Sequence, residues 1–102
     1  MQESKIFENL LKIAKGKQIE EIIFKDFKAA ADGYLKGNKI GIRLGISLKE
    51  INYTIAHELA HLYLHYDKAN TVKSSDHQRY EEQADRAAIL ILDVLQCSTE
   101  RN

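Results

Sequence analysis

The sequence predicts an α+β fold in which a short antiparallel β-hairpin packs against about three helices. Three stretches place apolar residues at helical spacing, and one shorter stretch alternates apolar with polar or small residues as a strand does. The 102 residues contain no repeat, no low-complexity tract and no proline. Because this length is close to the commonest domain size, we expect a single domain over residues 1–102.

The N-terminal third of the chain predicts a helix followed by a strand. Residues 3–15 carry apolar side chains at helical spacing, and Gly16 is a suitable stop. Residues 18–27 predict a strand, because their centre is the β-favouring Ile-Ile-Phe of residues 22–24. A short helix is the alternative for this segment.

Residues 31–45 predict a β-hairpin. Ile40, Ile42 and Leu44 alternate with polar or small residues, so this face should lie on the core. The KGNK segment at 36–39 contains residues that tolerate the positive φ of a tight turn.

Two further helices complete the prediction. Ser47 and Glu50 have the spacing of a capping box, and a helix should run from there to about Tyr66. Residues 67–76 are polar and loop-like, and Ser75 or Asp76 can cap a last helix that ends near Gln96, before a tail that should fray. The apolar stripes of the two helices are Ile51, Ile55, Leu59 and Leu62, and then Ala84, Ala87 or Ala88, Ile91, and Val94 or Leu95.

Composition excludes several classes of function. Fifteen Lys and Arg balance fifteen Asp and Glu, which argues against a nucleic-acid binder and against binding to an anionic membrane. A single cysteine, Cys97, excludes an internal disulfide and a cysteine-rich zinc cage. No stretch approaches the roughly 18 apolar residues of a membrane span, and the N-terminus lacks the apolar centre of a signal peptide. We therefore expect a cytoplasmic protein.

The four histidines point to a metal site, because all lie between residues 57 and 77. His57 and His61 are one turn apart on the predicted helix, about 6 Å along its axis, so both rings can bind one zinc ion. Glu58 adjoins the first ligand and could act on water as the general base of a metal-assisted hydrolysis. The alternative is a surface helix with two solvated histidines.

A catalytic zinc also needs a third protein ligand. His65 lies about 12 Å from His57 along an unbroken helix, so a hydrogen-bonding role at the site suits it better than ligation. Asp67 has the spacing of a third ligand in a related zinc-peptidase motif. That motif needs a glycine at the position of Leu64, so that the chain turns back toward the metal. Neither residue is therefore the favoured ligand.

Glu81 and Glu82 remain as candidates, and helix geometry separates them. Glu81 continues the apolar stripe of the last helix, where an unpaired carboxylate would be costly, whereas Glu82 lies on a polar face with Arg86 one turn further on. Asp85, one turn after Glu81, could accept the free ring N–H of His57 or His61. A salt bridge or a solvated position is the alternative for Asp85.

Two motifs together resemble the ImmA/IrrE metallopeptidase family. They are HELAHLYLH at residues 57–65 and YEEQADRAA at residues 80–88, which are similar to the family's HELGHxxLH and ExxA(D/N)xFA helices. The resemblance extends over roughly residues 20–95. It implies a small, single-domain, zincin-like α+β fold of gluzincin type. It also implies that His57, His61 and Glu81 bind one zinc ion and that Glu58 is the catalytic base.

The resemblance also implies a substrate. Members of the family cleave helix-turn-helix repressors of the XRE type and so derepress mobile elements or stress responses. We therefore expect a zinc-dependent endopeptidase whose partner is such a repressor, with no direct nucleic-acid or membrane partner. The alternative is a non-catalytic interaction module in which zinc only holds the fold together, acting as an antirepressor by stoichiometric binding.

Peptide hydrolysis also requires a donor to the oxyanion of the transition state. The sequence offers Tyr34, Tyr66, Tyr80 and His77 without choosing among them. Each tyrosine could equally be a half-buried packing residue.

Overall fold

Three helices and a three-stranded sheet make up residues 2–27, 32–65 and 77–100, which are the part of the chain that the computed structural model describes. The predicted α+β class is confirmed. The elements are, in chain order, α1 (Gln2–Gly16), β1 (Glu21–Lys25), β2 (Gly33–Lys36), β3 (Lys39–Arg43), α2 (Leu48–His65) and α3 (His77–Glu100). The loop predicted over 67–76, with its caps Ser75 and Asp76, lies outside the described residues.

The sheet has the strand order β1-β3-β2 and is mixed, with the predicted antiparallel hairpin as one part of it. β2 and β3 form the predicted antiparallel hairpin, and its turn uses Gly37 at a φ of 60°. β1 is a strand, not the alternative short helix, and it pairs in parallel with β3. Because β3 is the inner strand, both of its edges find backbone partners, and β2 is left as an edge strand.

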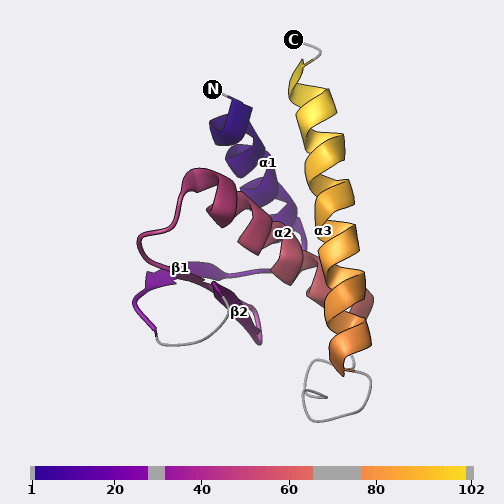
Figure 1. The fold of residues 1–102 in the computed structure, drawn as a ribbon. Coiled ribbons are helices and arrows are strands. Elements are labelled where there is room, and N and C mark those ends of the chain that lie inside the picture. Colours follow the sequence, from indigo (N-terminus) through magenta and orange to yellow (C-terminus); the bar gives the residue numbers. More distant parts are fainter. Residues whose placement is uncertain (1, 28–31, 66–76, 101–102) are drawn as a thin grey trace.

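α2 is the central element of the fold. It packs on β2 and β3 and also contacts α1 and α3 (Figure 1). Its predicted apolar stripe is confirmed, since Ile55 and Leu59 are buried and Ile51 and Leu62 pack against the core. The buried core comprises Ile6, Leu10, Ala14, Ile19, Ile40, Ile42, Ile55, Ala56, Leu59 and Ala88.

The predicted capping box starts α2. Ser47 Oγ accepts a hydrogen bond from the Glu50 N–H at 3.2 Å, while Glu50 Oε1 accepts from the Ser47 N–H at 3.2 Å and from Ser47 Oγ at 2.9 Å. These bonds satisfy N–H groups that the first turn of a helix leaves free. They also fix where the helix begins, and so the side on which His57 and His61 emerge about three to four turns later.

Two apolar residues that were expected in the core are exposed. Leu44 is 54% exposed, because β3 ends at Arg43 and the chain then turns at Gly45, whose φ is 87°. Val94 is 58% exposed, whereas Leu95 packs against the core, so the buried stripe of α3 follows the second of the two alternatives.

α3 is longer than predicted. It continues to Glu100, past the expected end near Gln96, so the tail that was expected to fray is helical up to that residue. Neither glycine nor proline interrupts the sequence between His77 and Glu100, which leaves no local reason for the helix to stop earlier.

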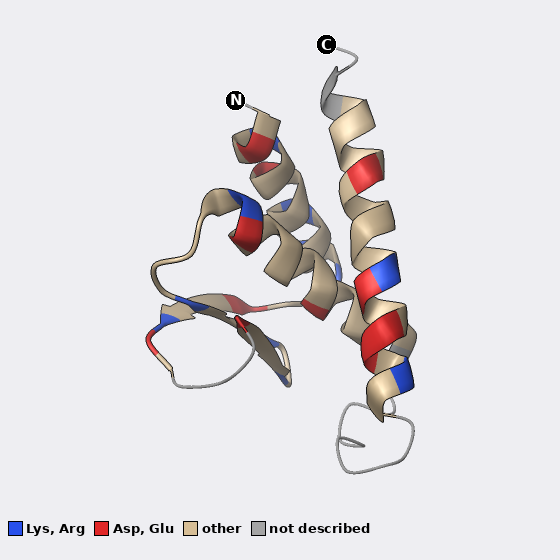
Figure 2. Cartoon of the chain, viewed as in Figure 1, with Lys and Arg blue, Asp and Glu red and all other residues tan. Residues whose placement is uncertain are grey.

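The distribution of charge on the surface agrees with the equal numbers of basic and acidic residues in the sequence. In the view of Figure 2, basic and acidic residues are intermixed along α1 and α3. Within the described ranges, no helix combines the length and the apolar character needed to cross a membrane.

Gly33 allows β2 to approach α2 closely. A Cβ atom at this position would lie 2.3 Å from Thr54 Cγ2, 2.9 Å from the carbonyl oxygen of Gly41 and 3.7 Å from Glu58 Oε2. The first two distances are too short for any side chain to be accepted without movement. The edge strand β2 therefore lies directly against the turns of α2 that carry Thr54 and Glu58.

We expect Gly33→Ala to lower the free energy of unfolding by about 1–3 kcal/mol, because over-packing would push β2 away from α2. Gly16→Ala is the matched control, since nothing lies within 4 Å of its Cβ position and this change in a helix should be neutral or stabilising. Urea unfolding of both variants measures the difference. Equal stability of the two variants would contradict the close approach of β2.

Candidate metal centre

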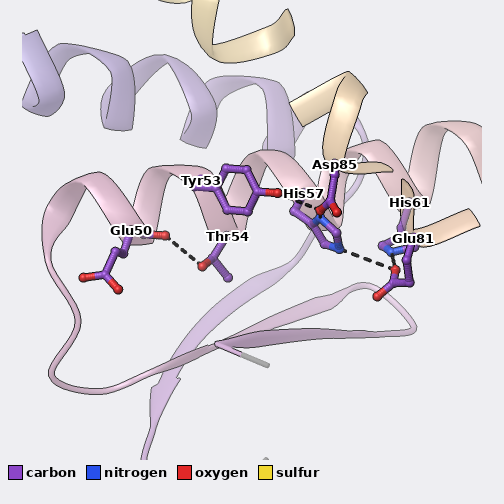
Figure 3. A network of polar contacts seen from close by, with 7 residues as sticks. All are labelled: Glu50, Tyr53, Thr54, His57, His61, Glu81 and Asp85. Atoms are coloured by element: carbon purple, nitrogen blue, oxygen red, sulfur yellow. Dashed lines mark hydrogen bonds and ion pairs between the residues drawn. The ribbon is translucent and has the colours of Figure 1, made fainter. Parts of the chain in front are cut away.

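α2 directs His57 and His61 toward the first turns of α3. The two rings are one helical turn apart, with centroids separated by 4.7 Å and planes inclined by 78°. Both side chains are largely buried. Glu81, on the second turn of α3, points between them (Figure 3).

The three side chains converge on one point. Glu81 Oε2 lies 3.5 Å from His57 Nε2 and in direct contact with His61 Nε2. One ligand atom from each residue falls within 4.8 Å of the others, and within the described ranges this is the group that could hold a metal ion. Zinc bonds of about 2.0–2.1 Å in a tetrahedral site place ligand atoms about 3.3 Å apart, so the cluster has the size of a single-ion site.

An unsatisfied buried atom indicates that the cluster fits a cation. Glu81 Oε2 is shielded from water, yet no hydrogen bond of acceptable geometry reaches it from the described residues. A buried carboxylate oxygen without a donor is costly, and a divalent cation between it and the two ring nitrogens would remove that cost. The Glu81 side chain as a whole is 40% exposed, so solvent reaches the edge of the cluster.

Glu58 follows His57 on α2 and is only 7% exposed. Burial raises the pKa of its carboxyl group to about 7, and the negative charge of Glu81 adds to this shift. A cation held by the cluster would lower the pKa of Glu58, because its positive charge favours the carboxylate form. A carboxyl group with a pKa near the working pH has the properties of a general base.

Asp85 and Tyr53 extend the cluster on the side of His57. Asp85 Oδ1 lies 2.9 Å from His57 Nδ1, so of the two histidines considered for it, Asp85 contacts His57. The same oxygen accepts a hydrogen bond of 2.6 Å from the hydroxyl of Tyr53 (Figure 3). The sequence analysis did not include Tyr53. Its position one turn before His57 was the available signal, but its partner Asp85 comes from another helix.

The structure also separates the two adjacent acids at the start of α3. Glu82 is exposed, whereas Glu81 meets the histidines. His65 is the last residue of α2, and its side chain is outside the described part of the chain. Tyr66 and Asp67, which were also candidates, lie wholly outside the described residues.

The remaining candidate donors to an oxyanion differ in position. His77 and Tyr80 are half-buried in the first turn of α3, close in sequence to Glu81. The ring of Tyr34 packs on Gly41 and against Phe27, with ring centroids 5.4 Å apart. Because side chains alternate along a strand and Gly33 faces α2, Tyr34 lies on the opposite face of the sheet from Glu58.

Residues 16–92 match the family model described as the IrrE N-terminal-like domain, Peptidase_M78. The chain belongs to this family. The match extends from the end of α1 into α3, so it includes both motif helices of this IrrE N-terminal-like domain and confirms the resemblance seen in its sequence. No curated protein and no solved structure matches the chain.

We expect Asp85→Ala to weaken zinc binding by this IrrE N-terminal-like domain about 10- to 100-fold, which is the usual cost of losing the partner of a ligating histidine. Asp93→Ala is the matched control, because Asp93 is an exposed acid on the same helix, two turns further on. Competition with a chromophoric chelator measures both affinities. An unchanged zinc titration for Asp85→Ala would reduce Asp85 to a surface acid.

Proposed function

We propose that this IrrE N-terminal-like domain is a zinc-dependent endopeptidase that cleaves a helix-turn-helix repressor of the XRE type. The observation that carries the proposal is the His57–His61–Glu81 cluster together with Glu58, a buried carboxylate that follows His57 on α2 and is near enough to Glu81 for the charge of Glu81 to raise its pKa. The family to which the chain belongs carries the name of a peptidase family, which supports a metallopeptidase-like function.

In this proposal the residues of the chain have separate roles. His57, His61 and Glu81 hold the ion, and zinc supplies Lewis acidity, which polarises a carbonyl group and makes water acidic near neutral pH. The Glu58 carboxylate takes the proton of the attacking water and then gives it to the amine that leaves. His77 and Tyr80 are better placed than Tyr34 to stabilise the oxyanion, because they share the start of α3 with Glu81.

The edge strand β2 offers a place for the substrate. One edge of β2 has no partner strand among the described residues, and Gly33 brings this strand against the turn of α2 that carries Glu58. An extended peptide can add to such an edge through backbone hydrogen bonds. Backbone bonding alone gives little selectivity, so we propose that a folded part of the repressor docks elsewhere and that cleavage occurs in a flexible linker.

The corresponding experiment compares two substrates. The zinc-loaded protein should cut an intact cognate helix-turn-helix repressor between its domains and should turn over short unrelated peptides poorly. Gel electrophoresis and mass spectrometry of the products locate the cut. Efficient cleavage of the short peptides with the repressor left intact would contradict the docking idea.

The alternative is a module that binds its partner stoichiometrically and uses the metal only to join α2 to α3. The same three ligands would serve this purpose, but a purely structural site has no use for a buried carboxylate beside it. An effect on the repressor that survives in the Glu58→Gln variant at one-to-one stoichiometry would favour this alternative.

A further inference from the structure

Tyr53, Asp85 and His57 form a chain of polar contacts that leads to the metal cluster. The Tyr53 hydroxyl donates a hydrogen bond of 2.6 Å to Asp85 Oδ1. The same oxygen lies 2.9 Å from His57 Nδ1, a buried atom that makes no hydrogen bond of acceptable geometry with the described residues, so this second link is a close polar contact. Tyr53 and His57 occupy successive turns of α2, with ring centroids 6.0 Å apart, whereas Asp85 reaches them from α3 (Figure 3). One carboxylate oxygen therefore faces groups from two turns of the neighbouring helix.

Asp85 needs such a constraint because its side chain is 50% exposed. A carboxylate with this exposure can rotate into water, and it then holds no ring in place. Tyr53 is itself held, since its ring packs against the hydrophobic core. Burial and the hydrogen bond to Asp85 raise the pKa of Tyr53 to about 12, so its hydroxyl remains a donor at neutral pH.

The contact at His57 Nδ1 determines what the other ring nitrogen can do. When a carboxylate accepts a proton from Nδ1, the lone pair of Nε2 is free to bind a metal. In this structure Nε2 is the atom that faces Glu81.

We propose that Tyr53 is a positioning residue of the metal centre, whose hydroxyl fixes Asp85 so that Asp85 fixes the tautomer and orientation of His57. This inference rests on the proposed metal-binding role of His57, His61 and Glu81. Tyr53 itself touches neither the ion nor the substrate in this assignment.

A double-mutant cycle tests the route through Asp85. Zinc affinity is measured by chelator competition for the parent, Tyr53→Phe, Asp85→Ala and the double variant. Phenylalanine keeps the ring and removes only the hydroxyl, so we expect Tyr53→Phe to weaken binding about threefold to tenfold, the size of one net hydrogen bond. In the Asp85→Ala background the same change should have no further effect, because the residue through which it acts is gone.

Tyr63→Phe is the matched control. Tyr63 lies on the same helix, is 72% exposed and contacts the Lys17 ammonium group instead of the cluster. Removal of the Tyr63 hydroxyl should leave zinc affinity unchanged. Thermal unfolding of the metal-free variants, followed by circular dichroism, should show that Tyr53→Phe retains the fold.

Nuclear magnetic resonance gives a second measurement that does not depend on zinc. Long-range proton–nitrogen spectra of the metal-free protein at mildly alkaline pH report the tautomer of His57. The parent should carry the ring proton on Nδ1, and Tyr53→Phe should increase the population with the proton on Nε2.

Two results would overturn the inference. One is an unchanged zinc affinity together with an unchanged His57 tautomer in Tyr53→Phe. The other is an equal loss of affinity from Tyr53→Phe with and without Asp85, which would mean that Tyr53 acts by a different route. If the parent bound no zinc, the proposed function would fail, and the tautomer measurement would still decide the role of Tyr53.

Discussion

Replacing Glu58 by glutamine should lower the rate of peptide hydrolysis by at least about 100-fold while zinc remains bound. Glutamine has nearly the same shape but no basic carboxylate, so it cannot take the proton of the attacking water, and general-base catalysis contributes about 10²- to 10⁴-fold. Glu58 is not one of the three clustered ligands, which is why metal content should be preserved. The rate is followed by repressor cleavage at equal zinc loading.

The same variant should change how stability depends on pH. Burial raises the pKa of Glu58 from its ordinary value of 4.5 to about 7, so between these pH values the metal-free folded protein holds a proton that the unfolded chain has released. The free energy of unfolding of the parent should therefore fall as the pH rises through this range, by an amount on the order of 3 kcal/mol. The Glu58→Gln variant should lack this decrease. Denaturant unfolding of both metal-free proteins across the range measures it.

Two outcomes would contradict the assignment of Glu58. Full turnover by zinc-loaded Glu58→Gln would exclude it as the base. Loss of zinc from the same variant would mean that Glu58 helps to hold the ion. Gly16→Ala, a change remote from the cluster on α1, provides the reference for ordinary variation between preparations.

Glu81→Ala should abolish stable zinc binding, whereas Glu82→Ala should leave it unchanged. Glu81 supplies the only carboxylate of the cluster in the described part of the chain, and its loss should cost more than the roughly 100-fold expected for an outer partner. Glu82 is exposed, and it is not a member of the cluster. The pair is well matched, since the two variants remove the same group from neighbouring positions.

Bound zinc is measured by atomic absorption after dialysis against a weak chelator. Retention of zinc by Glu81→Ala would show that another residue completes the site. Loss of zinc from Glu82→Ala instead would mean that α3 is rotated by one residue relative to the structure.

The sequence was sufficient for the parts of the site that depend on local spacing. The capping box at Ser47 fixes where α2 begins, and a four-residue interval places His57 and His61 on one face. The choice of Glu81 over Glu82 also followed from local periodicity, because Glu81 continues a stripe through Ala84 that the structure buries.

Other features depend on contacts between distant segments, which local spacing does not contain. The parallel pairing of β1 with β3 depends on which edge of the hairpin remains free, and the exposure of Leu44 depends on where β3 ends. Tyr53 was missed for the same reason, because its hydrogen-bond partner Asp85 is supplied by α3.

The three residues that could hold an ion come from two helices, α2 and α3, which are separated in the sequence by residues 66–76. Occupation of the site and attachment of α3 to α2 are therefore parts of one equilibrium. At a free zinc concentration 100 times the dissociation constant, mass action adds about 2.7 kcal/mol to the free energy of unfolding. Proteases act on opened chains, so the loaded protein should survive longer in a cell than the zinc-free protein. The zinc supply would then set the abundance of the protein as well as its activity.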